Sequence, residues 1–581
     1  MEINGAQMFV KALQEEHVDT LFAYPGGTAI DLFDALYDAE GIDMILPRHE
    51  QALVHAADGY ARSTGKVGVC LVTSGPGATN LVTGIATANY DSVPLVCFTG
   101  QVPMNLIGND AFQEVDIVGI TRSICKYAVT VRKREDLARI IKNAFYIART
   151  GKPGPVLVDI PKDIQLAMGS DEYPDEVNIR GYKPSEGVHS GQLKKALAEL
   201  NRAKKPVFLI GGGVNIAHAR KEMQELCELT GIPVVTTIMG KGAIPTDHPL
   251  YVGNIGMHGN LASNKAIMEC DVLFSIGTRF NDRITGTIDT FAKNAKIIHI
   301  DIDAASISRN IEVDIPIVAD AKLAITKMLK YAKKLDISDW VDEIMEVKRQ
   351  YPINMNSYKG VTPEKIIKTI NEMYDDLIIT TDVGQNQLWT TQYIALGGEN
   401  QLLTSGGLGT MGYGLPAAIG AKIGNPDKNV ICISGDGGVQ MNIQEMATAV
   451  AQELPITICI LNNGYLGNVR QWQELFFNKR YSSTCLRYRK SCNHDCQNPD
   501  KCCPKYTPDF VKLAESYEAL GIRVTKEEEI KAAFEQAKAN TKGPTVIEFY
   551  IDPTANVFPM VPGGKSLNDM IRDCEGGWTY E

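Results

Sequence analysis

The sequence of 581 residues lacks long hydrophobic runs and clusters of positive charge. No apolar run approaches the ~18 residues of a membrane-spanning helix, and the first residues lack the basic and apolar segments of a signal peptide. Lys and Arg number 58 against 69 Asp and Glu, which leaves a formal net charge of −11. Because nucleic-acid affinity comes from clustered cationic side chains, we expect a cytoplasmic protein that binds neither nucleic acid nor a membrane.

Low-complexity tracts and long blocks of one charge sign are absent as well, and the apolar (44%) and charged (22%) fractions are those of an ordinary globular protein. Thirteen cysteines are present, but several stand singly in apolar runs, where a buried thiol acts as a small hydrophobic group: Cys70, Cys97, Cys432 and Cys459. This pattern favours a reducing compartment over a disulfide framework.

Short apolar runs alternate with segments of helical periodicity along the chain. Continuous apolar strands separated by amphipathic helices indicate parallel sheets covered on both faces. The predicted class is therefore α/β, with doubly wound parallel sheets. The predicted strands are 67–72, 94–98, 156–160, 207–210, 272–276, 297–302, 430–433 and 456–461.

The chain is long enough for three or four domains at roughly 150 residues per domain. Two segments are typical of linkers: the polar, Pro-containing stretch 171–190, and the charged helical run 331–349 that leads to Gly360–Pro363. The predicted domains are 1–170, 190–335 and 360–555, followed by a C-terminal tail, 556–581.

The sharpest motif lies in the third segment. The strand 430–433 leads to Gly435, Asp436, Gly437 and Gly438, and the strand 456–461 leads to Asn462, Asn463, Gly464 and Tyr465. Glycines let the backbone approach a diphosphate, while Asp436 and Asn463 offer hard oxygen ligands at the carboxyl ends of two parallel strands. Gly-Asp-Gly alone usually marks an ordinary strand-to-helix turn. Its pairing with Asn-Asn across residues 438–461 matches a thiamine-diphosphate motif.

On these motifs the chain resembles the thiamine-diphosphate enzymes of the pyruvate-oxidase and acetohydroxyacid-synthase type over essentially its full length. The resemblance implies a pyrimidine-binding domain, a central domain and a diphosphate-binding domain, in this order. It also implies that Asp436, Asn463 and the backbone carbonyl of Tyr465 hold Mg²⁺. Because the two halves of the cofactor site would come from different chains, it implies a homodimer or homotetramer.

Glu50 opens a helix-like segment after an apolar run. A Glu in the first turn of a helix is usually a surface residue that compensates the helix dipole. In the family that the chain resembles, a glutamate in this place donates a proton to the pyrimidine ring. The ring's imino tautomer then removes the C2 proton of the thiazolium to give the ylid.

Other loops resemble the cofactor-binding segments of the same family. On the pyrimidine side these residues are Tyr24, Pro25, Gly26, Gly27, Pro76 and Asn80. On the diphosphate and thiazolium side they are Val383, Gly384, Gln385, Asn386, Gly409, Met411, Leu466, Gly467 and Asn468. By resemblance, Met411 is the apolar wedge between the two cofactor rings, whereas in a generic protein a Met beside glycines fills gaps in a core.

Four further residues distinguish the carboligase branch. The resemblance places Gln113 near the reacting carbons, Phe112 and Lys162 at the access channel, and Trp472 in the pocket for the second keto acid. The competing interpretations are a solvated Lys on a loop and an aromatic side chain in a core.

The central segment lacks the Gly-x-Gly-x-x-Gly fingerprint, so its spacing alone predicts only a nucleotide-sized crevice. The resemblance assigns it FAD in a structural role, since condensation involves no net redox change. The implied FAD residues are Lys152, Gly211, Gly212, Gly213, Gly256, Met257, His258, Gly277, Arg279, Asp282, Arg283, Asp301, Ile302 and Asp320.

The sequence departs from the family pattern in four places. Asn386 stands where His is frequent, Asn468 where Met is usual, and Lys152 where Arg is usual, which keeps the charge but loses bidentate geometry. The fourth departure is an insertion, 485–506, with Cys492, Cys496, Cys502 and Cys503 around His494. Zinc or an iron–sulfur cluster, disulfides, and an unligated loop are the alternatives for it.

The resemblance implies a carboligase that decarboxylates pyruvate and transfers the hydroxyethyl carbanion to a second pyruvate or to 2-ketobutyrate. The products, 2-acetolactate and 2-aceto-2-hydroxybutyrate, are precursors of valine, leucine and isoleucine. A flavin oxidoreductase of the pyruvate-oxidase type is the nearest alternative. Glu50 disfavours a glyoxylate carboligase, and Glu50, Asp436 and Asn463 together disfavour a non-enzymatic scaffold. A small regulatory subunit is a further implied partner.

Overall fold

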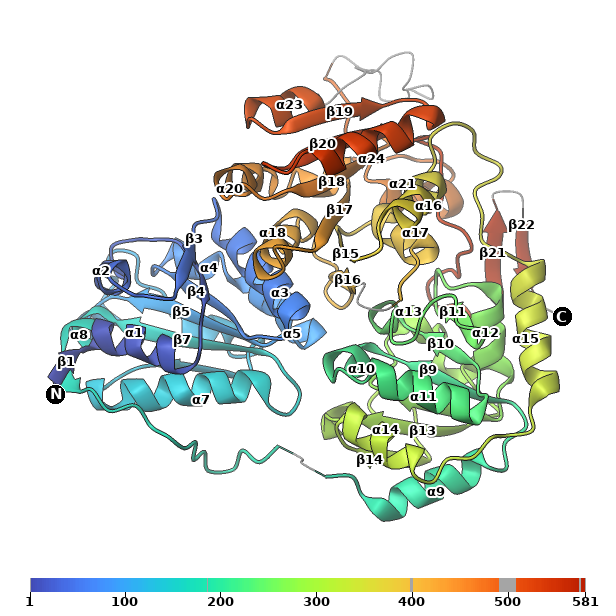
Figure 1. The fold of residues 1–581 in the computed structure, drawn as a ribbon, viewed down its shortest axis with the longest axis horizontal. Coiled ribbons are helices and arrows are strands. Elements are labelled where there is room, and N and C mark those ends of the chain that lie inside the picture. Colours follow the sequence, from blue (N-terminus) through green and yellow to red (C-terminus); the bar gives the residue numbers. More distant parts are fainter. Residues whose placement is uncertain (1, 185–186, 398–400, 491–507, 574–575, 580–581) are drawn as a thin grey trace.

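The computed structural model describes residues 2–184, 187–397, 401–490, 508–573 and 576–579. Three six-stranded parallel sheets follow one another along the chain, each flanked by helices (Figure 1). The predicted α/β class with three doubly wound sheets is confirmed. Among the described helices, none is both long and apolar enough to span a membrane.

The first sheet has the order β3-β2-β4-β5-β7-β6. Side chains alternate between a cluster beneath α1 and α7 on one face and a cluster beneath α3 and α5 on the other. Its strands are β2 Thr20–Ala23, β3 Asp43–Ile45, β4 Gly68–Val72, β5 Leu95–Gln101, β6 Tyr127–Thr130 and β7 Pro155–Pro161. Its helices are α1 Gly5–Glu15, α2 Ile30–Tyr37, α3 Glu50–Thr64, α4 Pro76–Thr79, α5 Val82–Asp91, α6 Ile117–Thr121, α7 Leu137–Arg149 and α8 Lys162–Leu166.

The third sheet, β16-β15-β17-β18-β20-β19, repeats the strand order of the first: numbered along the chain, both read 2-1-3-4-6-5. Its strands are β15 Leu377–Thr381, β16 Gln401–Leu403, β17 Asn429–Gly435, β18 Ile456–Asn462, β19 Leu520–Val524 and β20 Thr545–Tyr550. Its helices are α16 Pro363–Met373, α17 Gln385–Tyr393, α18 Gly414–Gly424, α19 Asp436–Val439, α20 Met446–Ala451, α21 Gly467–Phe476, α23 Phe510–Ser516 and α24 Ile530–Ala539.

The central sheet, β11-β10-β9-β12-β13-β14, reads 3-2-1-4-5-6 along the chain. In this order dinucleotides bind beyond the carboxyl ends of the strands where the order reverses, here between β9 and β12. The strands are β9 Pro206–Ile210, β10 Val234–Thr236, β11 Tyr251–Asn254, β12 Val272–Ile276, β13 Lys296–Asp301 and β14 Ile315–Val318. The helices are α9 Ser190–Leu200, α10 Gly212–Ile216, α11 Arg220–Thr230, α12 Leu261–Glu269, α13 Asp282–Thr285, α14 Ala321–Leu329 and α15 Ser338–Gln350.

Two segments are more integrated than the sequence suggests. The run 331–349, expected as a linker, contains α15, whose Trp340 and Ile344 join the central core. The tail beyond residue 555 also packs on the domains, because Val557 lies in the third-domain core, and Val561 and Leu567 lie in the central core. In addition, β21 Asp569–Asp573 pairs with β22 Gly576–Thr579, and β1 Glu2–Asn4 pairs with β8 Met168–Ser170.

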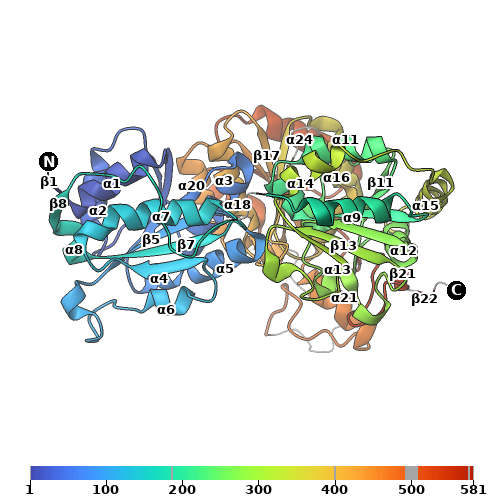
Figure 2. The same cartoon turned by 90° about the horizontal axis from the view of Figure 1, so that it is seen from below.

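The first and third domains meet along α3 and α18, which lie side by side (Figure 1). Their backbones approach closely at two glycines. A Cβ on Gly59 would overlap the carbonyl oxygen of Ala417, and a Cβ on Gly420 would overlap that of Ala56. Helix α18 continues directly from the loop that carries Gly409 and Met411, so this contact ties that loop to the first domain. Figure 2 shows the three domains from below.

Candidate active site and nucleotide pocket

The two halves of the Gly-Asp-Gly and Asn-Asn motif lie together at the carboxyl ends of β17 and β18, which pair in parallel with Gly435 opposite Leu461. The backbone N–H groups of Asn463 and Gly464 lower the pKa of the Asp436 carboxyl group, but burial has the larger effect. Burial raises the pKa of Asp436 to about 7. A divalent cation at this carboxyl would favour the ionised form, so the donor set fits Mg²⁺.

Asp382, which directly follows β15, organises the loops beside this motif. Its carboxylate accepts the N–H groups of Val383 (2.8 Å), Gly412 (3.0 Å) and Gly414 (3.2 Å). Burial raises the pKa of Asp382 to about 6. Asp382 stands in the segment 381–385 that resembles a cofactor-binding loop, but it is not among the residues predicted to bind the cofactor, although an acidic residue immediately after an apolar strand is a usable signal.

The glycines of the third domain form a cradle that side chains would fill. A Cβ on Gly437 would lie 2.7 Å from Leu466 and 3.7 Å from Cε of Met411. Asn386 and Asn468 each hold a buried amide oxygen that has no hydrogen-bond partner among the described residues. These two amide groups are therefore available to a polar ligand, and an amide NH₂ group can donate to the oxygens of a diphosphate.

In the first domain Glu50 opens α3, and one carboxylate oxygen accepts a hydrogen bond from the Asn80 amide at 2.9 Å. The loop after β2 reaches the same place, because a Cβ on Gly26 would lie 2.5 Å from Cβ of Thr73. The structure thus brings together the predicted pyrimidine-side residues Tyr24–Gly27, Glu50, Pro76 and Asn80 at the carboxyl ends of β2 and β4.

Glu445, which the sequence analysis missed, connects this region to the third domain. It is buried, and its two carboxylate oxygens accept the backbone N–H of Arg48 at 3.0 and 3.1 Å, across 397 residues of sequence. Arg48 lies two residues before Glu50.

The four residues expected around the substrate come from three segments: Phe112 and Gln113 are neighbours in one loop, Lys162 begins α8, and Trp472 lies in α21. Lys162 donates to the carbonyl of Gly27 (3.2 Å) and pairs with Asp31 (3.6 Å), so it borders the Tyr24–Gly27 loop. Gln113 has a left-handed backbone conformation (φ 61°) and packs closely against Gly75. A Cβ added to Gly75 would lie 2.9 Å from the Cβ of Gln113.

Two aromatic side chains remain available for a ligand or a partner. Phe112 is 87% exposed. The indole N–H of Trp472 is buried and has no acceptor within the described part of the chain.

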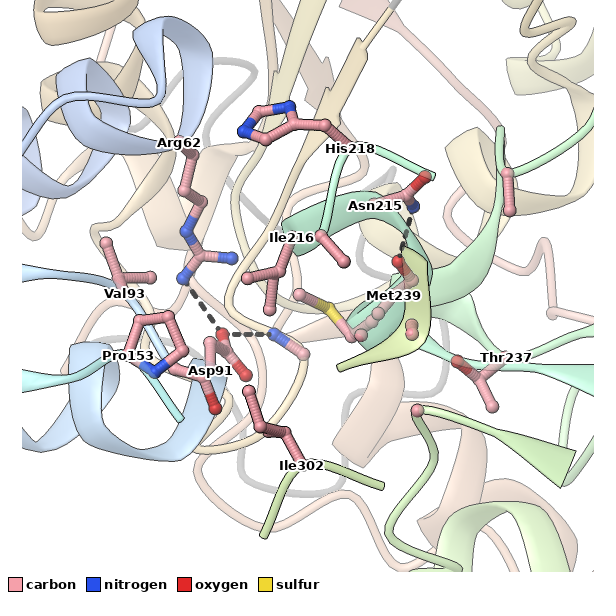
Figure 3. Close-up of a pocket in the computed structure, with 18 of the residues that line it drawn as sticks. Arg62, Asp91, Val93, Pro153, Asn215, Ile216, His218, Thr237, Met239 and Ile302 are labelled. Carbon is pink, nitrogen blue, oxygen red and sulfur yellow. Dashed lines mark hydrogen bonds and ion pairs between the residues drawn. The ribbon is translucent and has the colours of Figure 1, made fainter. Parts of the chain in front are cut away.

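A pocket of about 1010 Å³ lies between the three domains (Figure 3). Nine residues expected to bind FAD line it: Lys152, Gly212, Gly213, Gly277, Arg279, Arg283, Asp301, Ile302 and Asp320. Lys152 pairs with Asp303 at 3.2 Å. Burial raises the pKa of Asp301 to about 6, and the Lys152 and Arg279 charges oppose this rise.

The other expected FAD residues do not line the pocket: Gly211, Gly256, Met257, His258 and Asp282. Gly211 instead permits close packing of two loops, since its Cβ would overlap the carbonyl oxygen of Gly277. Met257 still lies at the edge of the pocket, because its N–H donates to the carbonyl of the lining residue Arg283 (2.8 Å).

The pocket wall also contains residues that the sequence analysis missed, among them Arg62, Asp91, Asn215, Thr237 and Met239. The Asn215 amide donates to the carbonyl of Met239 at 2.9 Å (Figure 3). Arg62, Asp91 and Asn215 lie in α3, α5 and α10, and Thr237 and Met239 follow β10, in segments without a recognisable motif.

The predicted second metal site, Cys492, Cys496, Cys502 and Cys503, lies outside the described residues. The structure describes the start of the insertion, where Cys485 forms an isolated antiparallel β-bridge with Tyr465. Just before it, the carbonyl of Thr484 accepts the backbone N–H of Leu466 (2.9 Å). Within the described ranges, no group of three or more His, Cys, Asp or Glu is arranged to hold a metal ion.

Comparison with known proteins gives matches along the whole chain. Residues 3–120 match the thiamine pyrophosphate enzyme N-terminal TPP binding domain, residues 193–328 the central domain, and residues 382–549 the C-terminal TPP binding domain.

Curated relatives match over almost their full length. A probable acetolactate synthase large subunit of Methanococcus aeolicus is 46% identical over 98% of this chain and 95% of its own. The acetolactate synthase large subunit of Corynebacterium glutamicum is 45% identical over 98% of this chain and 90% of its own. The acetolactate synthase isozyme 3 large subunit of Escherichia coli is 41% identical over 98% of both chains.

Proposed function

The chain belongs to the thiamine pyrophosphate enzymes, in the family of acetolactate synthase large subunits, and on this premise we propose the residues and reaction that follow. The protein decarboxylates pyruvate and transfers the two-carbon unit to a second pyruvate, giving 2-acetolactate, or to 2-ketobutyrate, giving 2-aceto-2-hydroxybutyrate. The observation that carries this proposal is the placement of the Glu50–Asn80 pair and the Asp436–Asn463 cluster at the carboxyl ends of two sheets with the same strand order.

Thiamine diphosphate, when bound, supplies the electron sink for decarboxylation. Asp436, Asn463 and the carbonyl of Tyr465 hold Mg²⁺, and the glycine cradle around Gly437 admits the diphosphate. Glu50 holds a proton at the pyrimidine nitrogen, and the Asn80 amide fixes the orientation of its carboxyl group.

The substrate lies between the two cofactor-binding domains. The ammonium of Lys162 attracts keto-acid carboxylates toward the Tyr24–Gly27 loop, to which it is hydrogen-bonded. The indole N–H of Trp472 offers a donor to the second keto acid. Gln113 and Phe112 complete the wall on the side of the first domain.

FAD occupies the pocket between the three domains. The volume of about 1010 Å³, the 3-2-1-4-5-6 strand order and the cations Lys152, Arg279 and Arg283 support this assignment. Lys152, Arg279 and Arg283 would hold the diphosphate of the flavin, and Asp301 and Asp320 would accept hydrogen bonds from its adenosine end. Because the condensation has no net redox change, the flavin is structural.

The working enzyme is a homodimer or homotetramer, in which the first domain of one chain and the third domain of another share a cofactor. Large apolar side chains exposed in one chain support burial by a second copy: Phe112 (87%), Phe477 (60%) and Met441 (55%). The relatives' names, "large subunit", support a small partner subunit.

Product analysis tests this function. Pyruvate is supplied with thiamine diphosphate, Mg²⁺ and FAD, and acetolactate is assayed while the flavin spectrum is recorded. We expect acetolactate without net flavin reduction. Acetate or acetyl phosphate accompanied by a reduced flavin would instead place the chain with the pyruvate-oxidase type of enzyme.

A further inference from the structure

The loop 404–413 carries Gly409 and Met411 and lies between the first and third domains. On the side of the third domain it is held by Asp382, which accepts Gly412 N–H, and by the Ser405 hydroxyl, which accepts Thr410 N–H (3.0 Å). Contacts on the other side come from the first domain, more than 300 residues away in the sequence.

Asp91, the last residue of α5, binds the backbone of this loop directly. One carboxylate oxygen accepts Gly406 N–H (3.1 Å) and the other accepts Gly407 N–H (2.8 Å); Figure 3 shows the carboxylate between Arg62 and the loop. A Cβ on Gly407 would lie 2.6 Å from the Asp91 carboxylate, so the approach requires glycine. Hydrogen bonds from backbone N–H groups to a carboxylate are charge-assisted and directional.

Arg62 holds Asp91 in place. The buried guanidinium pairs with Asp91 (3.0 Å) and with Asp58 (2.7 Å), and it donates to the carbonyl of Thr404 (3.0 Å) at the start of the loop. A buried ion pair adds little net stability, because desolvation offsets much of its attraction. The intact pair therefore mainly fixes the geometry of the loop, whereas removal of one partner leaves a buried charge unpaired and destabilises the fold.

Two further contacts surround Met411. The hydroxyl groups of Thr87 and Thr410 are 2.8 Å apart, and the hydroxyl of Tyr413 donates to Asp58 at 2.7 Å. Thr410 precedes Met411 and Tyr413 follows it by two residues, so the first domain fixes the loop on both sides of the methionine.

We propose that Asp91, together with Arg62, is a positioning pair that fixes the loop 404–413 from the first domain and thereby sets where Met411 lies in the cofactor site. A shift of the loop would move Met411 away from Gly437, because Cε of Met411 now lies 3.7 Å from the Cβ position of that glycine. The inference rests on the proposed thiamine diphosphate chemistry. Asp91 is not itself a catalytic residue.

The test is Asp91→Asn in the full-length chain with thiamine diphosphate and Mg²⁺ at saturation. The amide keeps the size of the side chain but points a donor at a loop N–H or at Arg62. We expect the rate of proton exchange at C2 of the bound cofactor to fall at least tenfold. The kcat should fall in parallel, while the KM for pyruvate changes less than threefold.

Glu364→Gln is the matched control. Glu364 in α16 is also a buried carboxylate that accepts a backbone N–H, from Met355 at 2.7 Å. We expect this variant to lower the Tm as Asp91→Asn does but to leave C2 exchange within twofold of the unmodified protein. Exchange within twofold in Asp91→Asn would overturn the proposal.

If Asp91→Asn does not fold, Thr87→Val tests the same loop with a nearly isosteric change that removes the partner of Thr410. We expect C2 exchange at least threefold slower, and an unchanged rate would overturn the proposal. Absence of C2 exchange in the unmodified protein with bound cofactor would be a different result, since it would contradict the proposed function itself.

Discussion

At the scale of single residues, Glu50 depends on the fold for its orientation. It lies in the first turn of α3, where the helix dipole favours a negative charge. The Asn80 amide, 2.9 Å away, holds one of its oxygens. The carboxyl group is therefore oriented before any ligand binds.

Glu50→Gln should abolish turnover while leaving cofactor binding nearly intact, because the amide keeps the shape but cannot hold or release the proton. General acid–base groups contribute roughly 10²–10⁴-fold, so we expect acetolactate formation to fall at least a hundredfold. The measurements are turnover and the Kd of thiamine diphosphate. Glu15→Gln, the same chemical change at an exposed position of α1, should leave both unchanged; turnover of Glu50→Gln within tenfold of the unmodified protein would refute the assigned role.

At the scale of secondary-structure elements, the contact between α3 and α18 depends on residues without side chains. Gly59 and Gly420 each face a backbone carbonyl of the opposite helix at a distance that excludes a Cβ. Any added atom must therefore separate the helices, and α18 continues directly from the loop that carries Met411.

Gly420→Ala should destabilise the protein by about 1–3 kcal/mol, as overpacking does in cores. The measurement is the Tm or the free energy of unfolding by denaturant. Gly543→Ala is the control, because no atom lies within 4 Å of its Cβ position, and it should change the stability by less than about 0.5 kcal/mol. Equal stability of the two variants would show that the helices separate at little cost.

The strands predicted from the sequence are all internal strands of their sheets, because a strand buried on both faces forms a continuous apolar run. The internal strands β2, β10, β15 and β20 were not predicted. The prediction 430–433 corresponds to β17 Asn429–Gly435, and 456–461 to β18 Ile456–Asn462. It missed edge strands such as β3 and β16, which have only three residues each. It also interpreted 331–349 as a linker, since charged residues dominate there and few side chains, Ile337, Trp340 and Ile344, are buried in the core.

The site was predictable where a motif is local and unpredictable where its partners are remote in sequence. Asp436 and Asn463 follow adjacent parallel strands, so their proximity follows from the topology. Asp91 and Glu445 gave no signal, since the groups they bind lie 315 and 397 residues away, respectively. Only the tertiary structure brings such residues to the loops that they hold.

At the scale of the whole molecule, Lys241 joins the central and third domains. Its ammonium is buried and donates to the carbonyl of Thr391 in α17, the helix that begins at Gln385. Burial, together with the smaller effect of the Lys348 charge, lowers the pKa of Lys241 to about 7. The folded protein thus holds this lysine mostly neutral above pH 7.

Lys241→Met should make the stability less dependent on pH. The folded pKa lies below the unfolded value of 10.5, so the unfolded chain binds more protons between pH 7 and 10, and this residue makes the free energy of unfolding rise with pH in that window. Below pH 7 the lysine is protonated in both the folded and the unfolded state. The folded state then carries the full cost of the buried charge, and this residue no longer makes the free energy of unfolding depend on pH. We expect the Tm difference, Lys241→Met minus the unmodified protein, to be more positive at pH 7 than at pH 9.

Lys194→Met removes an exposed ammonium from α9 and serves as the comparison, with an equal effect at both pH values. A Tm difference for Lys241→Met that does not change between pH 7 and pH 9 would mean that the buried lysine keeps its proton.

The repeated strand order of the first and third sheets has a consequence for the symmetry of the chain. In each sheet the helix at the contact, α3 or α18, is the one between the second and third strands. The pairs Ala56–Gly420 and Gly59–Ala417 run in opposite directions along the two helices, as equivalent elements related by a two-fold axis do. Within one chain the first and third domains are therefore placed about a pseudo-two-fold axis that passes between α3 and α18. Glu50 begins the helix at this contact in the first domain, and the loop that carries Met411 leads into its counterpart in the third domain.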